Sequence, residues 1–357
     1  MPDPRIEQYA QLLVERCIDV QPEQQVMIWT SPLARPLLEE VVRCIARRGA
    51  YALTRMSYAS VGNIWVNEAP EALVGKLSPI EQYSYEQAGA LINISAPENT
   101  RDGSDISPSR KVLQGQASQV IRDRINDEAF PWVTCVYPTP ALAQDAGMTL
   151  SRYEDFVFGA CLLDWDEEGR KMRRLADRFD AADEVRIVGA GTDLRLSLQG
   201  RVALVDDGHK NMPGGEFFYS PVEDSANGVI SYSEFPAVYG GYEVEGVRLV
   251  FEGGRVVEAT ARRNEEFLLK MLDADPGARV LGELGIGCNP GIQQHMENVL
   301  FDEKIYGTIH LAVGNGFPFI GGKNRSNVHW DMVKDLRQGG QIFCDGELVQ
   351  ENGVWQF

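Results

Sequence analysis

The sequence predicts two domains. Residues 1–182 are expected to form an α/β N-terminal domain with a largely parallel sheet, and residues 183–357 an α+β C-terminal domain with a mixed or antiparallel sheet. Three observations support this prediction. The chain has 357 residues, enough for two domains of ordinary size. Its first half alternates strand and helix patterns, whereas its second half has alternating strands joined by glycine turns.

The elements of the first half follow one another as a βαβ unit and its continuation. A strand is predicted over residues 24–32, ending at Ser31-Pro32. Residues 34–50 have helical spacing and end at Gly49, and residues 51–58 are the next strand. Strand, helix and strand in this order predict parallel pairing. Further strands are expected over residues 87–97 and 131–140, with a helix over residues 107–127 between them.

The second half begins after a long helical segment. Residues 151–180 are predicted to be helical and end in the charged stretch "EEGRKMRRLADRFDAAD", which places the domain boundary near Asp183. Residues 184–191, 192–200 and 246–261 then alternate apolar and polar positions, as in an antiparallel sheet. Residues 262–275 are predicted to form a helix.

Composition and motifs exclude several classes of function. The formal net charge is −18, from 52 acidic and 34 basic residues, which argues against a nucleic acid or an anionic membrane as a partner. No apolar run approaches the roughly 20 residues that span a membrane. The chain has neither GxGxxG after its first strand nor GxxxxGK[ST], so nucleotide binding has no support. The N-terminus is expected to be an amphipathic helix and not a signal peptide.

The cysteines and histidines are informative by their distribution. Six cysteines are scattered without a CxxC motif, which predicts reduced thiols in a cytoplasmic protein. Only four histidines occur, and three of them lie in the last 63 residues. Any chemistry that depends on histidine is therefore expected in the C-terminal half.

Three stretches of the second half hold single residues suited to binding a metal. Glu216 follows a Pro-Gly-Gly turn in "NMPGGEFFYSP", at the mouth of a strand. Glu283 lies within "VLGELGIG", where a lone acid is costly to bury without a cation or hydrogen-bond donors. His310 lies in the apolar strand "GTIHLAVG". Taken singly, these residues could instead be a solvated loop acid, an acid satisfied by donors and an ordinary core histidine.

A fourth stretch, "NVHWDMVKDL", places His329 and Asp331 two residues apart. On a strand such residues point the same way, about 7 Å apart along the chain, and could grip one ion or flank a pair. The alternative is an ordinary histidine beside a solvated aspartate. With the other three residues they make five ligands, and one bridging carboxylate plus two ligands per ion can hold two metals. Spacing alone does not select these five among 52 acidic residues.

The stretches "NMPGGEFFYSP", "LGELGIG", "FDEKIYGTIHLAVG" and "GGKNRSNVHWDM" together resemble the M29 family of metallo-aminopeptidases, also called aminopeptidase T. Their order and approximate separations are similar, and the resemblance spans most of the chain. It implies a two-domain fold, two divalent metal ions (Zn, Co or Mn), release of N-terminal amino acids from small peptides, and a homodimer that encloses its active sites. Carried over by motif, the implied metal ligands are Glu216, Glu283, His310, His329 and Asp331.

Glu283 and Glu303 are the predicted catalytic carboxylates. Glu303 lies seven residues before His310 and is expected to support a ligand or to hold the amine of the substrate; the alternative is a solvated turn acid. The sequence departs from the family at Phe317, where the family generally has a catalytic tyrosine. Phenylalanine cannot donate a hydrogen bond to an oxyanion, and losing such a donor typically costs about 10²–10³ in rate. Tyr306 or Lys323 could supply a substitute donor.

Two other functions compete with the aminopeptidase hypothesis. Ring-cleaving dihydroxypyridine dioxygenases resemble the same family, and two histidines with one carboxylate form a known Fe(II) site, part of which His310 or His329 with Asp331 could provide. Glu216 and Glu283 would then be superfluous, and the N-terminal half has no histidine to act as acid or base. The other hypothesis is a metal-binding protein that has lost peptidase activity through Phe317. Metal content distinguishes the three: two ions of Zn, Co or Mn, one Fe, or metal without turnover.

Overall fold

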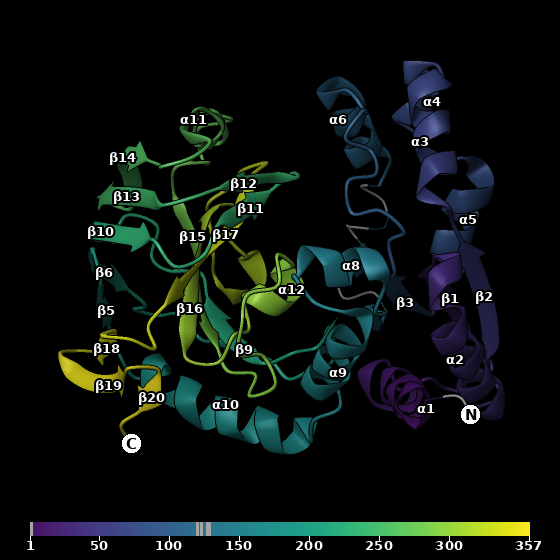
Figure 1. The fold of residues 1–357 in the computed structure, drawn as a ribbon, viewed down its shortest axis with the longest axis horizontal. Helices are drawn as coiled ribbons and strands as arrows, with labels where there is room; N and C mark the ends of the chain where they lie inside the picture. The colour runs from purple at the N-terminus through teal and green to yellow at the C-terminus, as the bar shows by residue number, and fades with distance from the viewer. Residues whose placement is uncertain (1–2, 119–120, 122–123, 126–129) are drawn as a thin grey trace. The chain divides into compact units, whose positions relative to one another are not determined.

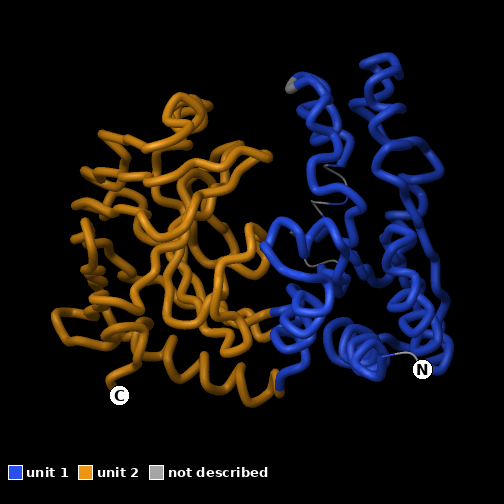
Figure 2. The backbone as a smooth tube through the Cα atoms, viewed as in Figure 1, with its two compact units in different colours: residues 1–163, 208–213 blue, residues 164–207, 214–357 orange. Residues whose placement is uncertain are grey.

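The computed structural model describes residues 3–118, 121, 124–125 and 130–357, and the chain divides into two compact units (Figures 1 and 2). Unit 1 contains Met1–Leu163 and Gly208–Pro213, and unit 2 contains Asp164–Asp207 and Gly214–Phe357. The sequence prediction put the boundary near Asp183. The division instead falls after Leu163, because helix α10 (Trp165–Asp180) packs on β7 and β9 of unit 2.

Unit 1 is an α/β layer built on one parallel sheet, as the sequence predicts. Its strand order is β2-β1-β3-β4-β8, and every pairing is parallel. The last strand, β8, comes from the short segment 208–213 and has no counterpart in the sequence prediction. The strands are β1 Gln25–Thr30, β2 Tyr51–Met56, β3 Ala90–Ser95, β4 Trp132–Val136 and β8 Asn211–Met212.

The helices of unit 1 follow from local signals. Helix α2 buries one apolar stripe, including Val41 and Ile45, and the chain turns back at Gly49 with φ of +74°. The other helical segments are α1 Pro4–Gln11, η1 Leu12–Cys17, η2 Pro32–Ala34, α2 Arg35–Arg47, α3 Ala59–Glu68, α4 Glu71–Val74, α5 Pro79–Gln87, α6 Pro108–Ala117, α8 Pro140–Asp145 and α9 Leu150–Cys161.

Two predicted helices differ in extent from the observed ones. The helix expected over residues 107–127 is described as α6, and residues 119–120, 122–123 and 126–127 of the prediction lie outside the described part of the chain. The helix expected over residues 151–180 is two helices, α9 and α10. Asp164 caps the second one by accepting a hydrogen bond from the backbone N–H of Glu167 at 3.0 Å, which explains the break.

Unit 2 contains three antiparallel sheets (Figure 1). An eight-stranded sheet has the order β14-β13-β10-β6-β5-β18-β19-β20, a five-stranded sheet β17-β16-β15-β9-β7, and β11 pairs with β12. The strands are β5 Glu184–Gly189, β6 Thr192–Ser197, β7 Leu204–Asp206, β9 Glu216–Tyr219, β10 Asn227–Tyr232, β11 Ala237–Tyr239, β12 Tyr242–Val244, β13 Val247–Glu252, β14 Arg255–Thr260, β15 Leu281–Gly287, β16 Thr308–Gly314, β17 His329–Asp335, β18 Gln341–Cys344, β19 Glu347–Glu351 and β20 Val354–Trp355. Helices α11 (Glu265–Leu272) and α12 (Val299–Asp302) and the turn η3 (Pro318–Ile320) complete the unit.

The five-stranded sheet has one face committed to the hydrophobic core. Alternate residues of strands β15, β16 and β17, such as Ile286, Leu311 and Trp330, are buried in the same core cluster as residues of the eight-stranded sheet. Because side chains alternate between the faces of a strand, the intervening residues must point to the opposite face. None of the helices in the described ranges combines the length and apolarity that crossing a bilayer requires.

Candidate metal centre

The second face of the five-stranded sheet gathers the five residues that the sequence analysis selected. Glu216 begins β9, Glu283 lies on β15, His310 lies on β16, and His329 and Asp331 lie on β17. The register pairs Glu283 and Asp331 with the same residue, Ala312. The strands that carry these residues are neighbours in one sheet, although they span more than a hundred positions of sequence (Figure 1). Side chains on one face of neighbouring strands are next to one another.

Glu283 lies between the two histidines. Its Oε1 is 3.4 Å from Nε2 of His310, and its Oε2 is 3.1 Å from Nε2 of His329. The remaining two acids flank this group: Glu216 Oε2 is 3.5 Å from His310 Nε2, and Asp331 Oδ1 is 3.6 Å from His329 Nε2. Glu283 therefore directs one oxygen toward His310, which Glu216 flanks, and the other toward His329, which Asp331 flanks.

Both imidazole rings are fixed through their other nitrogen. Nδ1 of His310 donates to the carbonyl oxygen of Glu303 at 3.0 Å, and Nδ1 of His329 donates to that of Asn315 at 2.9 Å. A carbonyl can only accept a hydrogen bond, so each Nδ1 carries a proton and each Nε2 faces the cluster. Backbone contacts of this kind set the orientation of histidines that bind metals.

Gly285 makes room for the ring of His310. These two residues are directly paired across β15 and β16. A Cβ atom at position 285 would lie 1.9 Å from Cε1 of His310 and 2.1 Å from its Nε2, far inside van der Waals contact. The glycine in "GELGIG" is therefore a steric requirement of the imidazole that lies across it, and its role follows from the strand register.

The cluster is buried except at His329, whose side chain is 29% exposed, and two of its carboxylate oxygens have no hydrogen-bond partner among the described residues. Glu216, Glu283 and His310 are at most 4% exposed. Glu216 Oε2 and Asp331 Oδ1 are buried without a hydrogen-bond partner among the described residues. Unsatisfied carboxylate oxygens are costly to bury, and a cation is the usual compensation. Oxygen and imidazole donors together suit Zn, Co and Mn.

The pKa values reflect this crowding of charge. Burial opposes ionisation of Glu283, but the hydrogen bonds from His310 and His329 outweigh it and lower the pKa of Glu283 to about 2. Burial alone would lower the pKa of His310, yet its bond to Glu283 and the charge of Glu216 raise that pKa to about 10. Burial raises the pKa of Asp331 to about 6. A metal ion would have to displace protons from both histidines, so binding releases protons and weakens as the pH falls.

Three further residues border the cluster. Lys304 is fully buried, with Nζ 3.0 Å from Glu216 Oε1 and 3.7 Å from Asp206 Oδ2, and it also pairs with Glu303. One carboxylate oxygen each of Glu216 and Glu303 and one ring nitrogen of His310 lie within 4.8 Å of one another. The sequence analysis selected Glu303 but missed Lys304 and Asp206. Their signal was weak, because a lysine in "DEK" and an aspartate in "VDDG" are typical of solvated turns.

Phe317 lies beside the cluster, and its two suggested substitutes have other surroundings. The ring of Phe317 packs on His329 with centroids 5.0 Å apart. The backbone N–H of Tyr306 donates to the carbonyl of Ile292 at 3.0 Å, and burial raises the pKa of its phenol. Lys323 is exposed, and its backbone N–H donates to Glu223 at 2.6 Å. These hydrogen bonds of Tyr306 and Lys323 are with groups outside the five-residue cluster.

Comparison with known proteins gives consistent matches over nearly the whole chain. Residues 2–355 match the model of the family described as thermophilic metalloprotease (M29). The chain is 27% identical to aminopeptidase AmpS of Bacillus subtilis, with 99% of this chain and 98% of that protein covered. It is 35% identical to aminopeptidase T of Thermus thermophilus over 52% of this chain and 49% of that protein.

Two solved structures share the fold. The structure of AmpT from Thermus thermophilus superposes with a TM-score of 0.86 and 21% identity, covering 99% of both chains. That of 2,5-dihydroxypyridine dioxygenase from Pseudomonas putida gives 0.62 and 15%, covering 98% of this chain and 96% of the other. At these identities the likeness shows the fold alone, which is the two-domain fold predicted from the sequence.

Replacing Gly285 by alanine should disable the cluster without unfolding the sheet. The added Cβ would force the ring of His310 away from Glu283. We expect metal affinity to fall at least about tenfold, which is the typical effect of disturbing the orientation of a metal ligand. Isothermal titration calorimetry of the metal-free protein with Zn²⁺ or Co²⁺ measures this change in affinity. Gly159→Ala, on α9 with open space around the glycine, is the matched control and should bind metal normally. Unchanged affinity in Gly285→Ala would show that His310 does not hold the metal from its observed position.

Proposed function

Since the chain belongs to the M29 family of metalloproteases, we propose that it is a metal-dependent aminopeptidase that releases N-terminal amino acids from small peptides. One observation carries the proposal: three carboxylates and two imidazoles converge on one buried sheet face, and two of the carboxylate oxygens lack a hydrogen-bond partner among the described residues. All six cysteines are buried thiols, which agrees with a cytoplasmic location.

We propose that the cluster holds two divalent ions, Zn, Co or Mn. Glu283 would offer one oxygen to each ion. Glu216 and His310 would complete the first position, and His329 and Asp331 the second. When bound, such ions would polarise the scissile carbonyl and lower the pKa of a water molecule. Other groups of the chain orient the proposed ligands. The backbone carbonyls of Glu303 and Asn315 hold the imidazole rings of His310 and His329, and the ammonium group of Lys304 contacts Glu216.

The proposed activity predicts a dependence on metal and on a free α-amine. Exhaustive chelation should abolish hydrolysis of aminoacyl p-nitroanilides, and adding back Zn²⁺, Co²⁺ or Mn²⁺ should restore it, with two ions per chain at full activity. N-acetylated versions of the same substrates should not be cleaved. Cleavage of the acetylated compounds at a similar rate would rule out an aminopeptidase, and activity that survives metal removal would rule out a metal-dependent one.

Glu303 is proposed to bind the substrate amine. Its side chain is 16% exposed and borders Glu216 and His310, so its carboxylate can attract an ammonium group at the edge of the cluster. Glu303→Gln should raise KM for free-amine substrates at least about tenfold, equivalent to about 1.4 kcal/mol of binding. Metal content, measured by atomic emission, should stay at the wild-type level. An unchanged KM would remove Glu303 from substrate recognition.

Phe317 offers a test of how this chain departs from its family. Its ring already lies against His329, and the residue is only partly buried, so a tyrosine can extend its hydroxyl without repacking a core. Phe317→Tyr restores a hydrogen-bond donor, and we expect turnover of a good peptide substrate to rise at least about tenfold, or about 1.4 kcal/mol of transition-state stabilisation.

The control for this variant is Phe319→Tyr, which alters the exposed ring next to Phe317. That substitution should leave turnover unchanged. A metal-loaded, folded Phe317→Tyr enzyme with no gain in turnover would mean that the chain uses another donor or has lost peptidase activity.

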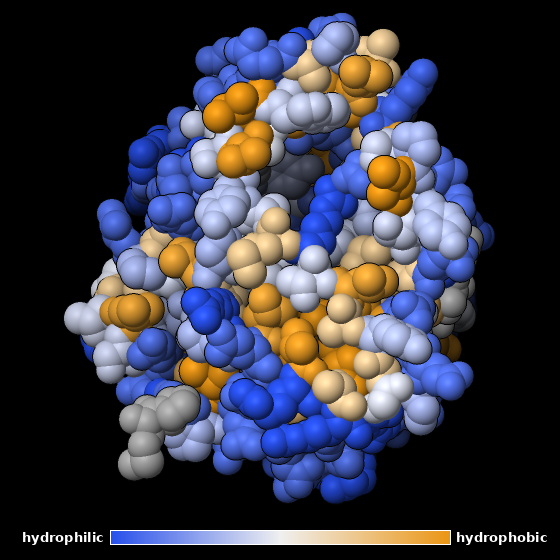
Figure 3. Space-filling model, turned by 90° about the vertical axis from the view of Figure 1, so that its right-hand side faces the viewer, coloured by the Kyte–Doolittle hydropathy of each residue, from blue (hydrophilic) through white to orange (hydrophobic). Residues whose placement is uncertain are grey.

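A homodimer is proposed to form through the open edge of β2 in unit 1. This strand is outermost in its sheet, and its outer edge pairs with no strand in the described ranges. Tyr51, Leu53 and Met56 are 42–59% exposed, and apolar side chains gather on the face shown in Figure 3, on the side where Figure 1 draws β2, α3 and α5. Residues 50–66 contain one charged residue, Arg55, and no proline. Exposed edge strands usually carry charged residues or prolines, which prevent pairing with another chain, and β2 has few of them.

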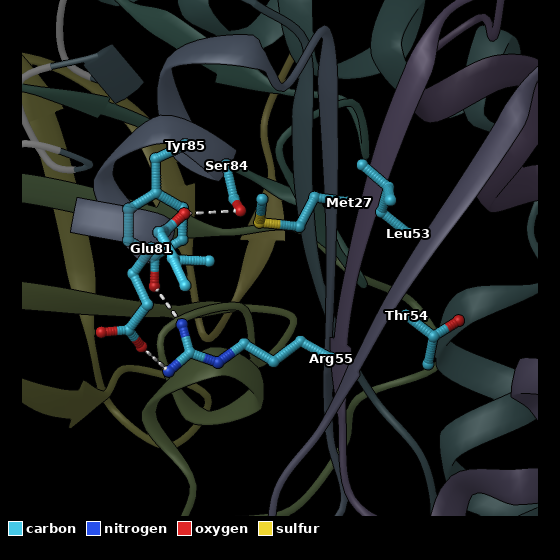
Figure 4. A pocket seen from close by; sticks show the side chains of 8 residues that line it. Met27, Leu53, Thr54, Arg55, Glu81, Ser84 and Tyr85 are labelled. Atoms are coloured by element: carbon cyan, nitrogen blue, oxygen red, sulfur yellow. Dashed lines mark hydrogen bonds and ion pairs between the residues drawn. The ribbon is translucent and has the colours of Figure 1, made fainter. Parts of the chain in front are cut away.

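Grooves on both faces of β2 suit an added strand. One, of about 310 Å³, lies between β2 and α5, where Arg55 is held by Glu81 and Tyr85 (Figure 4). The other, of about 690 Å³, is lined by α2 and Thr54. A strand from a second copy would direct alternate side chains into the two grooves. The charged residues that line the two grooves are three arginines and two glutamates, so the net charge of −18 is not concentrated at this edge, and a second copy can approach it: Arg55 and Glu81 in one groove, and Glu39, Arg43 and Arg47 in the other.

Leu53→Lys should therefore convert the dimer into a monomer. It places like charges opposite each other at a self-complementary edge, and light scattering after size-exclusion chromatography at micromolar concentration measures the result. Val257→Lys is the control, because Val257 is an exposed residue on β14, the edge strand of another sheet. A dimeric Leu53→Lys variant would place the interface elsewhere.

A further inference from the structure

Lys304 is a fully buried lysine whose ammonium group is surrounded by carboxylates. Its side chain is fully buried, and Nζ faces three carboxylates: Glu216 at 3.0 Å, Asp206 at 3.7 Å and Glu303 in closer contact. Burying an ammonium group costs several kcal/mol unless its partners compensate. One of these partners, Glu216, is part of the cluster proposed to bind metal, and the other two border it, so the position of Lys304 affects a proposed ligand directly.

Lys304 divides the two oxygens of Glu216 between two roles. Oε1 faces the ammonium group, whereas Oε2 faces Nε2 of His310 at 3.5 Å and has no hydrogen-bond partner in the part of the chain that the structure describes. Without Lys304, Glu216 could rotate about its side-chain bonds and turn away from His310. With it, one oxygen is held in place and the other stays directed at the cluster.

The backbone around Lys304 is itself fixed. Its N–H donates to the carbonyl of Phe301 at 3.0 Å, and its carbonyl accepts from the N–H of Asn289 at 3.0 Å. The preceding carbonyl, that of Glu303, accepts from Nδ1 of His310. One turn therefore orients both Glu216, through the lysine side chain, and His310, through the peptide before it.

We propose that Lys304 is a positioning residue that presets the metal position formed by Glu216 and His310. The proposal rests on the two-ion function proposed above. The charges agree with it: the cluster and its border contain five carboxylates and one ammonium, an excess of four negative charges that two divalent ions would neutralise. The five carboxylates are Asp206, Glu216, Glu283, Glu303 and Asp331.

The test compares two buried lysines. Lys304→Met removes the ammonium group beside Glu216. Lys334→Met is the matched control, because Lys334 is also fully buried but points to the opposite face of β17, where it contacts Glu234 at 2.7 Å and the carbonyl of Ala190 at 3.3 Å. Both variants remove a buried charge and are expected to lower thermal stability. Each metal-free protein is titrated with Co²⁺ by calorimetry.

The wild type is expected to bind two Co²⁺ ions per chain. Lys334→Met should bind two ions with the same affinity at each site as the wild type. Lys304→Met should keep one affinity and weaken the other at least about tenfold, the typical effect of removing a group that orients a ligand. Two unchanged affinities in Lys304→Met would overturn the proposal. If the wild type binds a single ion, the two-ion function is wrong. The role of Lys304 then stands only if Lys304→Met binds that ion more weakly than Lys334→Met does, and it falls if the two variants bind it equally well.

A measurement on the wild type covers the case in which Lys304→Met does not fold. Nitrogen-15 resonances of lysine ammonium groups report hydrogen bonding at Nζ, and Lys304→Arg identifies the signal of Lys304. Adding Zn²⁺ should shift the Lys304 resonance as metal occupies the Glu216 position and leave the Lys334 resonance in place. A Lys304 resonance that does not respond to metal would contradict the proposal.

Discussion

The concentration of negative charge on one buried face of the five-stranded sheet is the constraint on which unit 2 depends. Carboxylates are rarely buried without cations or donors, because removing them from water costs several kcal/mol each. Here Glu216, Glu283 and Asp331 share one face with two histidines, and the opposite face belongs to the hydrophobic core. Side chains along β15, β16 and β17 point alternately to these two faces, apart from a register shift between Leu281 and Glu283, so one layer of backbone separates the two environments.

The segment of residues 303–310, which runs from the end of α12 into β16, satisfies several of these electrostatic demands at once. Within eight residues it supplies a backbone carbonyl to His310, a carboxylate from Glu303, the ammonium group of Lys304 and His310 itself. The small residue Gly285 then leaves space for the imidazole on the neighbouring strand. Substitutions here are therefore expected to change metal binding before they change the fold, because the sheet pairs through its backbone and the core lies on the other face.

The fold was predictable where the pattern is local. Parallel strands in the first half and antiparallel strands in the second follow from apolar periodicity, and they are confirmed. The segment 208–213, which returns to unit 1 as β8, and the break between α9 and α10 depend on tertiary contacts and on the cap at Asp164, so periodicity did not reveal them. The five cluster residues were selected by resemblance, since spacing alone fits many acids. Lys304, Asp206 and Gly285 were missed because their roles depend on neighbours far away in the sequence.

The same electrostatics bear on the alternative of a single iron. The sequence analysis took Asp331 as the carboxylate of an iron site, but Glu283 is the carboxylate that lies between the two histidines, so the geometry permits a site of His310, His329 and Glu283. It would leave the unpartnered oxygens of Glu216 and Asp331 buried, with Lys304 as the cation that faces Glu216. Two ions, as proposed, would use both of these oxygens and would match the excess charge. The dioxygenase that shares the fold therefore gives no reason to prefer iron: family membership favours a metal-dependent peptidase, and the charge agrees with the proposed pair of ions.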